Sequence, residues 1–180
     1  THHKCKFCTL YHDLPFRFRM SPLTDIERDL QEVQLWSTDP ISMLTARLRG
    51  VPRPEGLRRA FLTGANPFVL QPRRLMAIAG LIRQYLPSIR TIGCFARVTD
   101  ITRKSDGELA ALAEAGYDGL TIGIETGDDG ALAFMKKGYA AADIVEQCCR
   151  LDRAGIHYSF FYLAGISGAG RGEAGAMATA

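Results

Sequence analysis

The 180-residue sequence has no long hydrophobic run and no strong excess of charge of one sign. No apolar stretch approaches the roughly 20 residues that a membrane-spanning helix needs, and no signal-peptide pattern is present. The 22 Lys and Arg residues nearly balance the 19 Asp and Glu residues, leaving a net charge of +3. A charge this small does not indicate binding to nucleic acid. The sequence therefore predicts a cytoplasmic protein with neither a membrane nor a nucleic-acid partner.

The chain has only five cysteines, an odd number, and four of them fall in two close pairs. An odd number is not typical of a secreted disulfide framework, and close cysteine pairs in a reducing compartment more often bind metal or carry out redox chemistry. Cys5 and Cys8 have the C-x2-C spacing, which lets two thiolates bind one metal centre, either zinc or an iron–sulfur cluster. Cys94 falls in an expected strand, and Cys148 and Cys149 fall in an expected helix, so core packing is the simpler interpretation for these three.

Apolar segments and helical patterns alternate along the chain. Each apolar segment is rich in β-branched or aromatic residues and bounded by Gly, Pro or Asn, which is typical of a buried strand. Four such segments are expected: Arg58–Gly64, Arg90–Arg97, Asp118–Gly127 and Ile156–Gly165. Helical patterns cover Thr24–Trp36, Pro72–Leu86, Ser105–Ala115 and Ala141–Ala154. The alternation, with a period of about 30 residues, predicts an α/β fold with a parallel sheet and helices packed outside it.

Four strands do not distinguish an open doubly wound sheet from a barrel, but both bind ligands at the carboxyl ends of their strands. Gly64 and Asn66 follow the first expected strand, where Gly allows close backbone approach and Asn offers both a donor and an acceptor. An ordinary turn is the alternative. Arg97 follows the second strand, where it would bind a carboxylate or form a surface ion pair with Asp100.

Glu125 ends the third expected strand. A carboxylate at the mouth of a sheet is costly unless it is paired or binds a ligand, and it can accept hydrogen bonds from the two hydroxyls of a ribose. The alternative is that Glu125 caps the next helix. Gly165 opens a glycine-rich stretch after the fourth strand, which would either wrap a cofactor or form a flexible end.

Four segments in this order resemble a known family: "HHKCKFCTLY", "FLTGANP", "IGIETGDDGALAFMKKG" and "YLAGISGAGRGEAG". With them the sequence resembles the radical S-adenosylmethionine (radical SAM) superfamily, and within it the iron–sulfur oxidoreductase-like group. The resemblance implies a partial (β/α)6 TIM-like barrel, of which the four expected strands would be the second to the fifth. Residues 1–180 would then be an incomplete core domain, with the first strand upstream of Thr1 and the sixth downstream of Ala180.

The resemblance also implies the cofactors, a 4Fe–4S cluster and S-adenosylmethionine. The cluster would cleave S-adenosylmethionine reductively to a 5′-deoxyadenosyl radical, which takes hydrogen from a substrate, and a flavodoxin or ferredoxin would supply the electron. Cys5 and Cys8 would be two of three cluster ligands. The usual C-x3-C-x2-C motif places the first ligand on Thr1, whereas a four-residue gap places it directly before Thr1.

By the same resemblance, Phe7 borders the adenine and Glu125 holds the ribose. Gly64 and Asn66 align with a Gly-Gly-Glu segment that contacts the methionine amino group, although Ala65 and Asn66 replace its second Gly and its Glu. Arg97 would pair with the methionine carboxylate, and Gly165 would lie against the adenine; the substrate is not indicated. The rival hypotheses are a non-catalytic zinc-binding or scaffold α/β module, which would use Cys5, Cys8 and a histidine, and a homologue that has kept the barrel and lost the chemistry.

Overall fold

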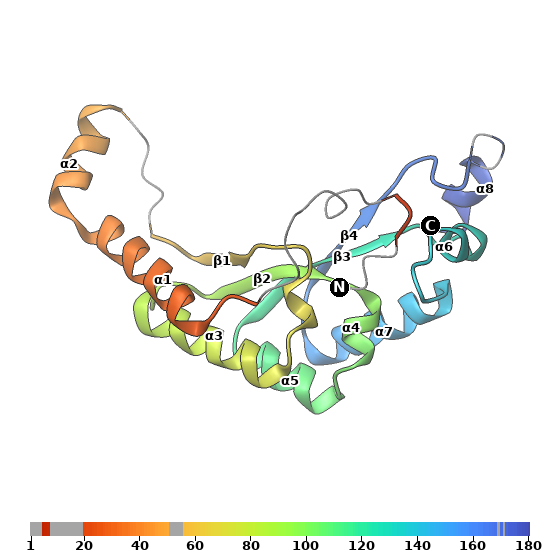
Figure 1. Ribbon diagram of the computed structural model, residues 1–180, viewed down its shortest axis with the longest axis horizontal. Coiled ribbons are helices and arrows are strands. Elements are labelled where there is room, and N and C mark those ends of the chain that lie inside the picture. The colour runs from red at the N-terminus through yellow and green to blue at the C-terminus, as the bar shows by residue number, and fades with distance from the viewer. Residues whose placement is uncertain (1–4, 8–19, 51–55, 169, 171) are drawn as a thin grey trace.

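A computed structural model describes residues 5–7, 20–50, 56–168, 170 and 172–180. Its centre is a sheet of four parallel strands, which lie side by side in the order of the sequence (Figure 1). They are β1 (Arg59–Leu62), β2 (Thr91–Ala96), β3 (Tyr117–Glu125) and β4 (Tyr158–Tyr162). Because the order does not reverse, the sheet has the topology of a barrel segment rather than of a doubly wound sheet. The four described strands do not close into a barrel.

Helices cover one face of this sheet, as the sequence predicts (Figure 1). They are α3 (Pro72–Tyr85), α4 (Val98–Thr102), α5 (Asp106–Glu114) and α7 (Ala141–Ala154). The predicted apolar stripe of α3 is buried, with Leu75 completely inaccessible to solvent. Tyr117 of β3 is equally buried and donates its hydroxyl to the Leu75 carbonyl at 2.8 Å, so the start of β3 is tied to α3.

Alternation along β2 divides its side chains between the two faces of the sheet. Ile92, Cys94 and Ala96 are buried in the core beneath the helices. Burial raises the pKa of Cys94 to about 12, which agrees with its expected packing role. Cys148 of α7 also belongs to the core, whereas Cys149 is exposed.

The opposite face, which we call the inner face, carries glycine and aromatic residues. The Phe95 ring lies 5.0 Å from the Phe61 ring and 5.8 Å from the Phe161 ring, measured between centroids. These rings span β1, β2 and β4, and Phe61 and Phe161 are exposed. The inner face of the described sheet is therefore partly open, and β1 and β4 are its edge strands.

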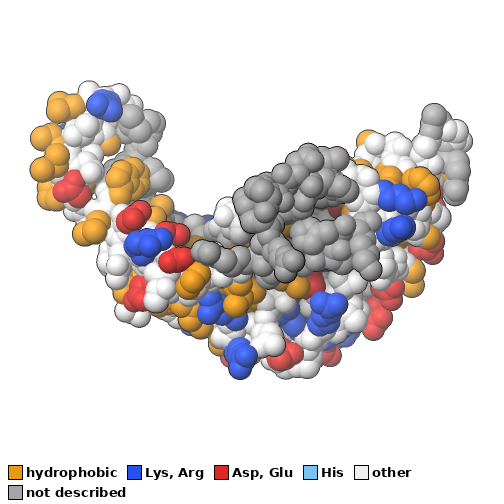
Figure 2. Space-filling view, viewed as in Figure 1, with side chains coloured by type: hydrophobic (Ala, Val, Ile, Leu, Met, Phe, Trp, Pro, Cys, Tyr) orange, Lys and Arg blue, Asp and Glu red, His pale blue; other side chains and the backbone are white. Residues whose placement is uncertain are grey.

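Several helices were not predicted from the sequence, mostly because they are too short to show a repeating pattern. These are α2 (Pro40–Leu48), α4, α6 (Asp129–Phe134), α8 (Gly172–Met177) and the 3-10 helix η1 (Pro67–Val69). Helix α1 (Leu23–Thr38) was predicted two residues too short at its carboxyl end. Figure 2 shows hydrophobic side chains gathered on the lobe formed by α2, which contributes no buried residue to the core. No helix in the described ranges is long and apolar enough to cross a membrane.

Candidate cofactor site at the carboxyl ends of the strands

Glu125 is the last residue of β3 and is nearly buried, with 8% of its surface exposed. Its backbone has a φ of 68°, the left-handed region that a residue with a side chain rarely adopts. Such a conformation costs of order 1–3 kcal/mol and persists only where the surrounding structure imposes it, often at functional sites. Here the residue after β4 contributes, since the Leu163 amide donates to the Glu125 carbonyl at 2.9 Å. The backbone thus presents this carboxylate at the carboxyl edge of the sheet.

Lys137 lies against Glu125. Its ammonium donates to Glu125 Oε1 at 3.1 Å and to the Gly123 carbonyl at 2.8 Å, and its side chain is 3% exposed. Burial lowers the pKa of Lys137, and the neighbouring Glu125 carboxylate partly offsets this effect. The Tyr139 hydroxyl also donates to the Gly123 carbonyl, at 2.8 Å. The carboxylate is therefore held in a buried ion pair within a hydrogen-bonded cluster.

Sequence reasoning missed Lys137 as a site residue. The only signal was its presence in the third resembling segment, "IGIETGDDGALAFMKKG". Twelve residues separate it from Glu125, with α6 between them, and no strand or helix periodicity relates the two positions. Lys136, which precedes it, has a φ of 57°, so a tight turn redirects the chain after α6 and brings Lys137 back to the sheet.

The amino-terminal segment reaches the same cluster. The Lys6 amide donates to the Met135 carbonyl at 3.3 Å, and the Phe7 ring lies with its centroid 5.5 Å from Lys137 Nζ. Cys5 directly precedes Lys6 in this segment. The structure therefore brings Cys5, Phe7 and Glu125 to one edge of the sheet, while Cys8 lies outside the described residues.

Arg97 follows β2 and also reaches this edge. Its guanidinium donates to the Lys137 carbonyl at 2.7 Å. The surface ion pair between Arg97 and Asp100, one of the two sequence-based alternatives, is wrong because Asp100 is only 3% exposed. Asp100 instead accepts a 2.5 Å hydrogen bond from the Asn66 amide nitrogen.

Gly64 and Gly165 follow β1 and β4. Both have positive φ, 110° and 75°, and no atom of the described residues lies within 4 Å of the position that a Cβ would take at either residue. The backbone at these two predicted site positions is therefore accessible to a ligand.

The alternative that Glu125 caps the following helix is wrong. The Asp128 side chain caps α6 instead, since it accepts hydrogen bonds from the amides of Gly130 and Ala131 at 2.9 and 3.3 Å.

The described side chains suit a polar, charged ligand better than a bare metal ion. They offer a carboxylate, a buried ammonium and open glycine backbone at one edge. No group of three or more His, Cys, Asp or Glu side chains within the described ranges is placed to hold a metal ion. The zinc hypothesis depends on Cys8, His2 and His3, all of which lie outside those ranges.

Comparisons with known proteins bear on the family and the fold of the chain. A family model described as the radical SAM superfamily matches residues 2–177. No curated protein sequence matches the chain. Among solved structures, the chain is similar to the cobalamin-dependent S-adenosylmethionine radical enzyme OxsB with aqua-cobalamin and S-adenosylmethionine bound. The TM-score is 0.64 at 15% identity, over 90% of this chain and 22% of that one.

Two other enzymes show the same fold. Methylornithine synthase (PylB) has a TM-score of 0.63 and 16% identity, over 97% of this chain and 44% of that one. Coproporphyrinogen III oxidase (HemN) from Escherichia coli, titled a radical SAM enzyme, has a TM-score of 0.59 and 14% identity, over 92% of this chain and 35% of that one. The chain thus spans less than half the length of these enzymes. The family match over nearly all of its length nevertheless shows that this chain belongs to the radical SAM superfamily.

Proposed function

We propose that this chain is the core of a radical SAM enzyme that uses a 4Fe–4S cluster and S-adenosylmethionine to start radical chemistry on a substrate. One observation carries the proposal: the segment Cys5–Phe7 and the Glu125 carboxylate lie on either side of the buried Lys137 ammonium, which is 5.5 Å from the Phe7 ring centroid and 3.1 Å from Glu125 Oε1, at the carboxyl edge of a parallel sheet. A thiolate for the cluster and a carboxylate for the cofactor would therefore lie within reach of one bound molecule. Family membership supports both cofactors.

Cys5 and Cys8 would supply two thiolates to the cluster, and the third would come from a cysteine upstream of Thr1. The bound cluster and S-adenosylmethionine would supply the electron transfer and the carbon radical. Glu125 would accept hydrogen bonds from the two ribose hydroxyls. The Lys137 ammonium binds Oε1 of this carboxylate, and a carboxylate has acceptor sites on both of its oxygens.

Lys137 is suited to the methionine carboxylate. An ammonium has three donors, and two are used by Glu125 and the Gly123 carbonyl. The third has no acceptor among the described residues, so it is available to an anionic ligand. Arg97, whose guanidinium already reaches the Lys137 carbonyl, would assist as predicted from the sequence.

Phe7 and Gly165 would border the adenine. The substrate would lie over the inner face, where the rings of Phe61, Phe95 and Phe161 form an apolar surface. Such a surface would shield a radical from water. An electron donor such as a flavodoxin or ferredoxin would reduce the cluster.

Metal analysis of the full-length protein, purified without oxygen, tests the proposal. We expect iron and acid-labile sulfide in about fourfold molar amounts, with the visible absorbance of a 4Fe–4S cluster. Cys5→Ala and Cys8→Ala should each remove most of both. Cys149→Ala, at an exposed position on α7, is the matched control and should keep them. Stoichiometric zinc without iron would instead favour the zinc-binding module.

A further inference from the structure

A buried polar pair lies beside the candidate site. Asn66 follows β1 and is 6% exposed, and Asp100 of α4 is 3% exposed. The Asn66 amide nitrogen donates to Asp100 Oδ2 at 2.5 Å. Buried polar groups of this kind need partners, because an unpaired one loses its hydrogen bonds to water without replacing them.

The chemistry of this contact orients the Asn66 side chain. An ionised carboxylate only accepts hydrogen bonds, so the amide nitrogen must face Asp100 and the amide oxygen must face away. That oxygen, Asn66 Oδ1, is buried and accepts no hydrogen bond from the described part of the chain. A buried acceptor without a donor, at the edge where Gly64 leaves the backbone open, indicates that a bound molecule supplies the donor.

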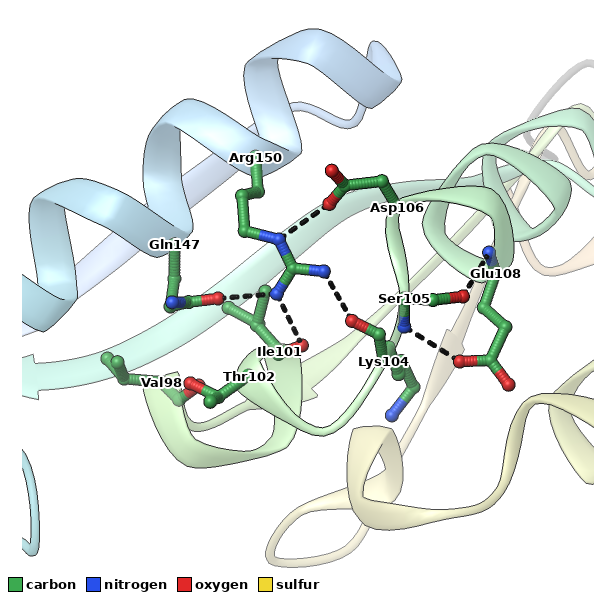
Figure 3. Close-up of polar contacts among 9 residues, drawn as sticks. All are labelled: Val98, Ile101, Thr102, Lys104, Ser105, Asp106, Glu108, Gln147 and Arg150. Atoms are coloured by element: carbon green, nitrogen blue, oxygen red, sulfur yellow. Dashed lines mark hydrogen bonds and ion pairs between the residues drawn. The ribbon is translucent and has the colours of Figure 1, made fainter.

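The segment that carries Asp100 is firmly held. Lys104 is 4% exposed and donates its ammonium to the Phe68 carbonyl at 2.6 Å and to the Asp100 carbonyl at 3.3 Å. Arg150 of α7 binds the carbonyls of Ile101, at 3.2 Å, and of Lys104, so it clamps the chain on the carboxyl side of Asp100 (Figure 3). These contacts restrict the movement of the carboxylate relative to Asn66.

The charges near Asp100 leave its carboxylate available to polarise the amide. Arg103 Nη1 lies 3.8 Å from Asp100 Oδ1, but its side chain is 72% exposed and its charge is screened by solvent. The Lys104 ammonium is directed to backbone carbonyls, and burial lowers its pKa. A buried anion at the nitrogen of an amide makes the amide oxygen a stronger acceptor for an N–H donor.

We propose that Asp100 is a positioning residue, which orients and polarises Asn66 so that the Asn66 amide oxygen accepts a hydrogen bond from an amino group of the ligand. The inference rests on the proposed function, in which that ligand is S-adenosylmethionine and the amino group is that of its methionine part. It makes Asp100 a determinant of specificity for ligands that carry this group.

The test compares two ligands on the anaerobically reconstituted full-length protein by equilibrium dialysis. One is S-adenosylhomocysteine, and the other is its deaminated analogue, which keeps the carboxylate and lacks only the amino group. Asp100→Asn is nearly isosteric, and its amide oxygen still accepts from Asn66, so the fold is retained while the charge is lost. We expect about tenfold weaker binding of S-adenosylhomocysteine and less than a twofold change for the deaminated analogue.

Two further variants complete the experiment. Asn66→Ala should lose the same preference between the two ligands, whereas Asp152→Asn, at an exposed carboxylate on α7, should keep it. An unchanged preference in Asp100→Asn, or an equal loss for both ligands, would overturn the positioning role and leave the proposed function standing. A wild-type protein with a loaded cluster that binds neither ligand would overturn both.

Discussion

Replacing Lys137 with Met should destabilise the protein strongly. The side chains of Lys137 and Glu125 are only 3% and 11% exposed, and their charged atoms lie 3.1 Å apart. Without the ammonium, the Glu125 carboxylate stays buried with no countercharge, and breaking a buried pair in this way typically costs about 3–5 kcal/mol. We expect a loss of about 3 kcal/mol in the free energy of unfolding, or roughly 10 °C in Tm for a domain of this size.

A double-mutant cycle in urea unfolding of the full-length protein separates the ion pair from simple packing. Glu125→Gln alone leaves the buried Lys137 ammonium without a countercharge. The double variant Lys137→Met with Glu125→Gln removes both charges. The double variant should therefore be more stable than the sum of the single effects predicts, by at least about 1.5 kcal/mol. The control is Arg28→Met, which removes the exposed pair between Arg28 and Asp25 at 3.7 Å and should cost less than about 1 kcal/mol.

Additive effects of the two single variants would refute this reasoning. So would a cost for Lys137→Met no larger than that of the Arg28 control. Either result would mean that the ammonium and the carboxylate do not depend on each other in solution. The description of this cluster as the centre of the cofactor site would then lose its main support.

Three further predictions follow from the same region and its sheet. Because burial lowers the pKa of Lys137 below its ordinary value of 10.5, the unfolded chain binds more protons between the two values. The stability of the wild type relative to Lys137→Met should therefore rise as the pH increases towards 10.5 in urea titrations, and a constant or falling difference would contradict the shift. Gly93→Ala should destabilise by about 1–3 kcal/mol, because its Cβ would lie 2.9 Å from both the Gly119 carbonyl oxygen and the Phe61 ring. Gly80→Ala, in open space on α3, should stabilise by about 1 kcal/mol, and similar effects of the two substitutions would be inconsistent with the packing of the inner face. Finally, Glu125→Ala should weaken S-adenosylmethionine binding at least tenfold in equilibrium dialysis, with Glu114→Ala on the surface of α5 as its control; unchanged affinity would argue against the ribose role.

Local sequence signals predicted the longer helices well. Helix α7 has the predicted bounds because Gly155 adopts a φ of 72° and ends it. Helix α5 begins where Ser105 and Glu108 form the predicted capping box, with hydrogen bonds of 3.2 and 2.8 Å. Both signals act between residues a few positions apart, so they can be recognised in the sequence without knowledge of the tertiary structure.

The candidate site was predictable only in part. Glu125 and Arg97 could be placed at one edge because the carboxyl ends of parallel strands meet there. Asp100 was considered only as a surface partner of Arg97, because nothing in the local sequence shows that α4 turns its carboxylate towards Asn66, 34 residues earlier. Lys137 was missed for the same reason.

The sequence by itself determined the alternation of strands and helices, the places where most of them end, and the family to which the chain is similar. These features depend on side-chain periodicity, caps and short motifs, all of which act over a few residues. Only the tertiary structure decided the consecutive strand order, the open inner face, and the pairing of Glu125 with Lys137 and of Asn66 with Asp100. Those features depend on contacts between distant segments, which form only when the whole sheet and its helices pack together.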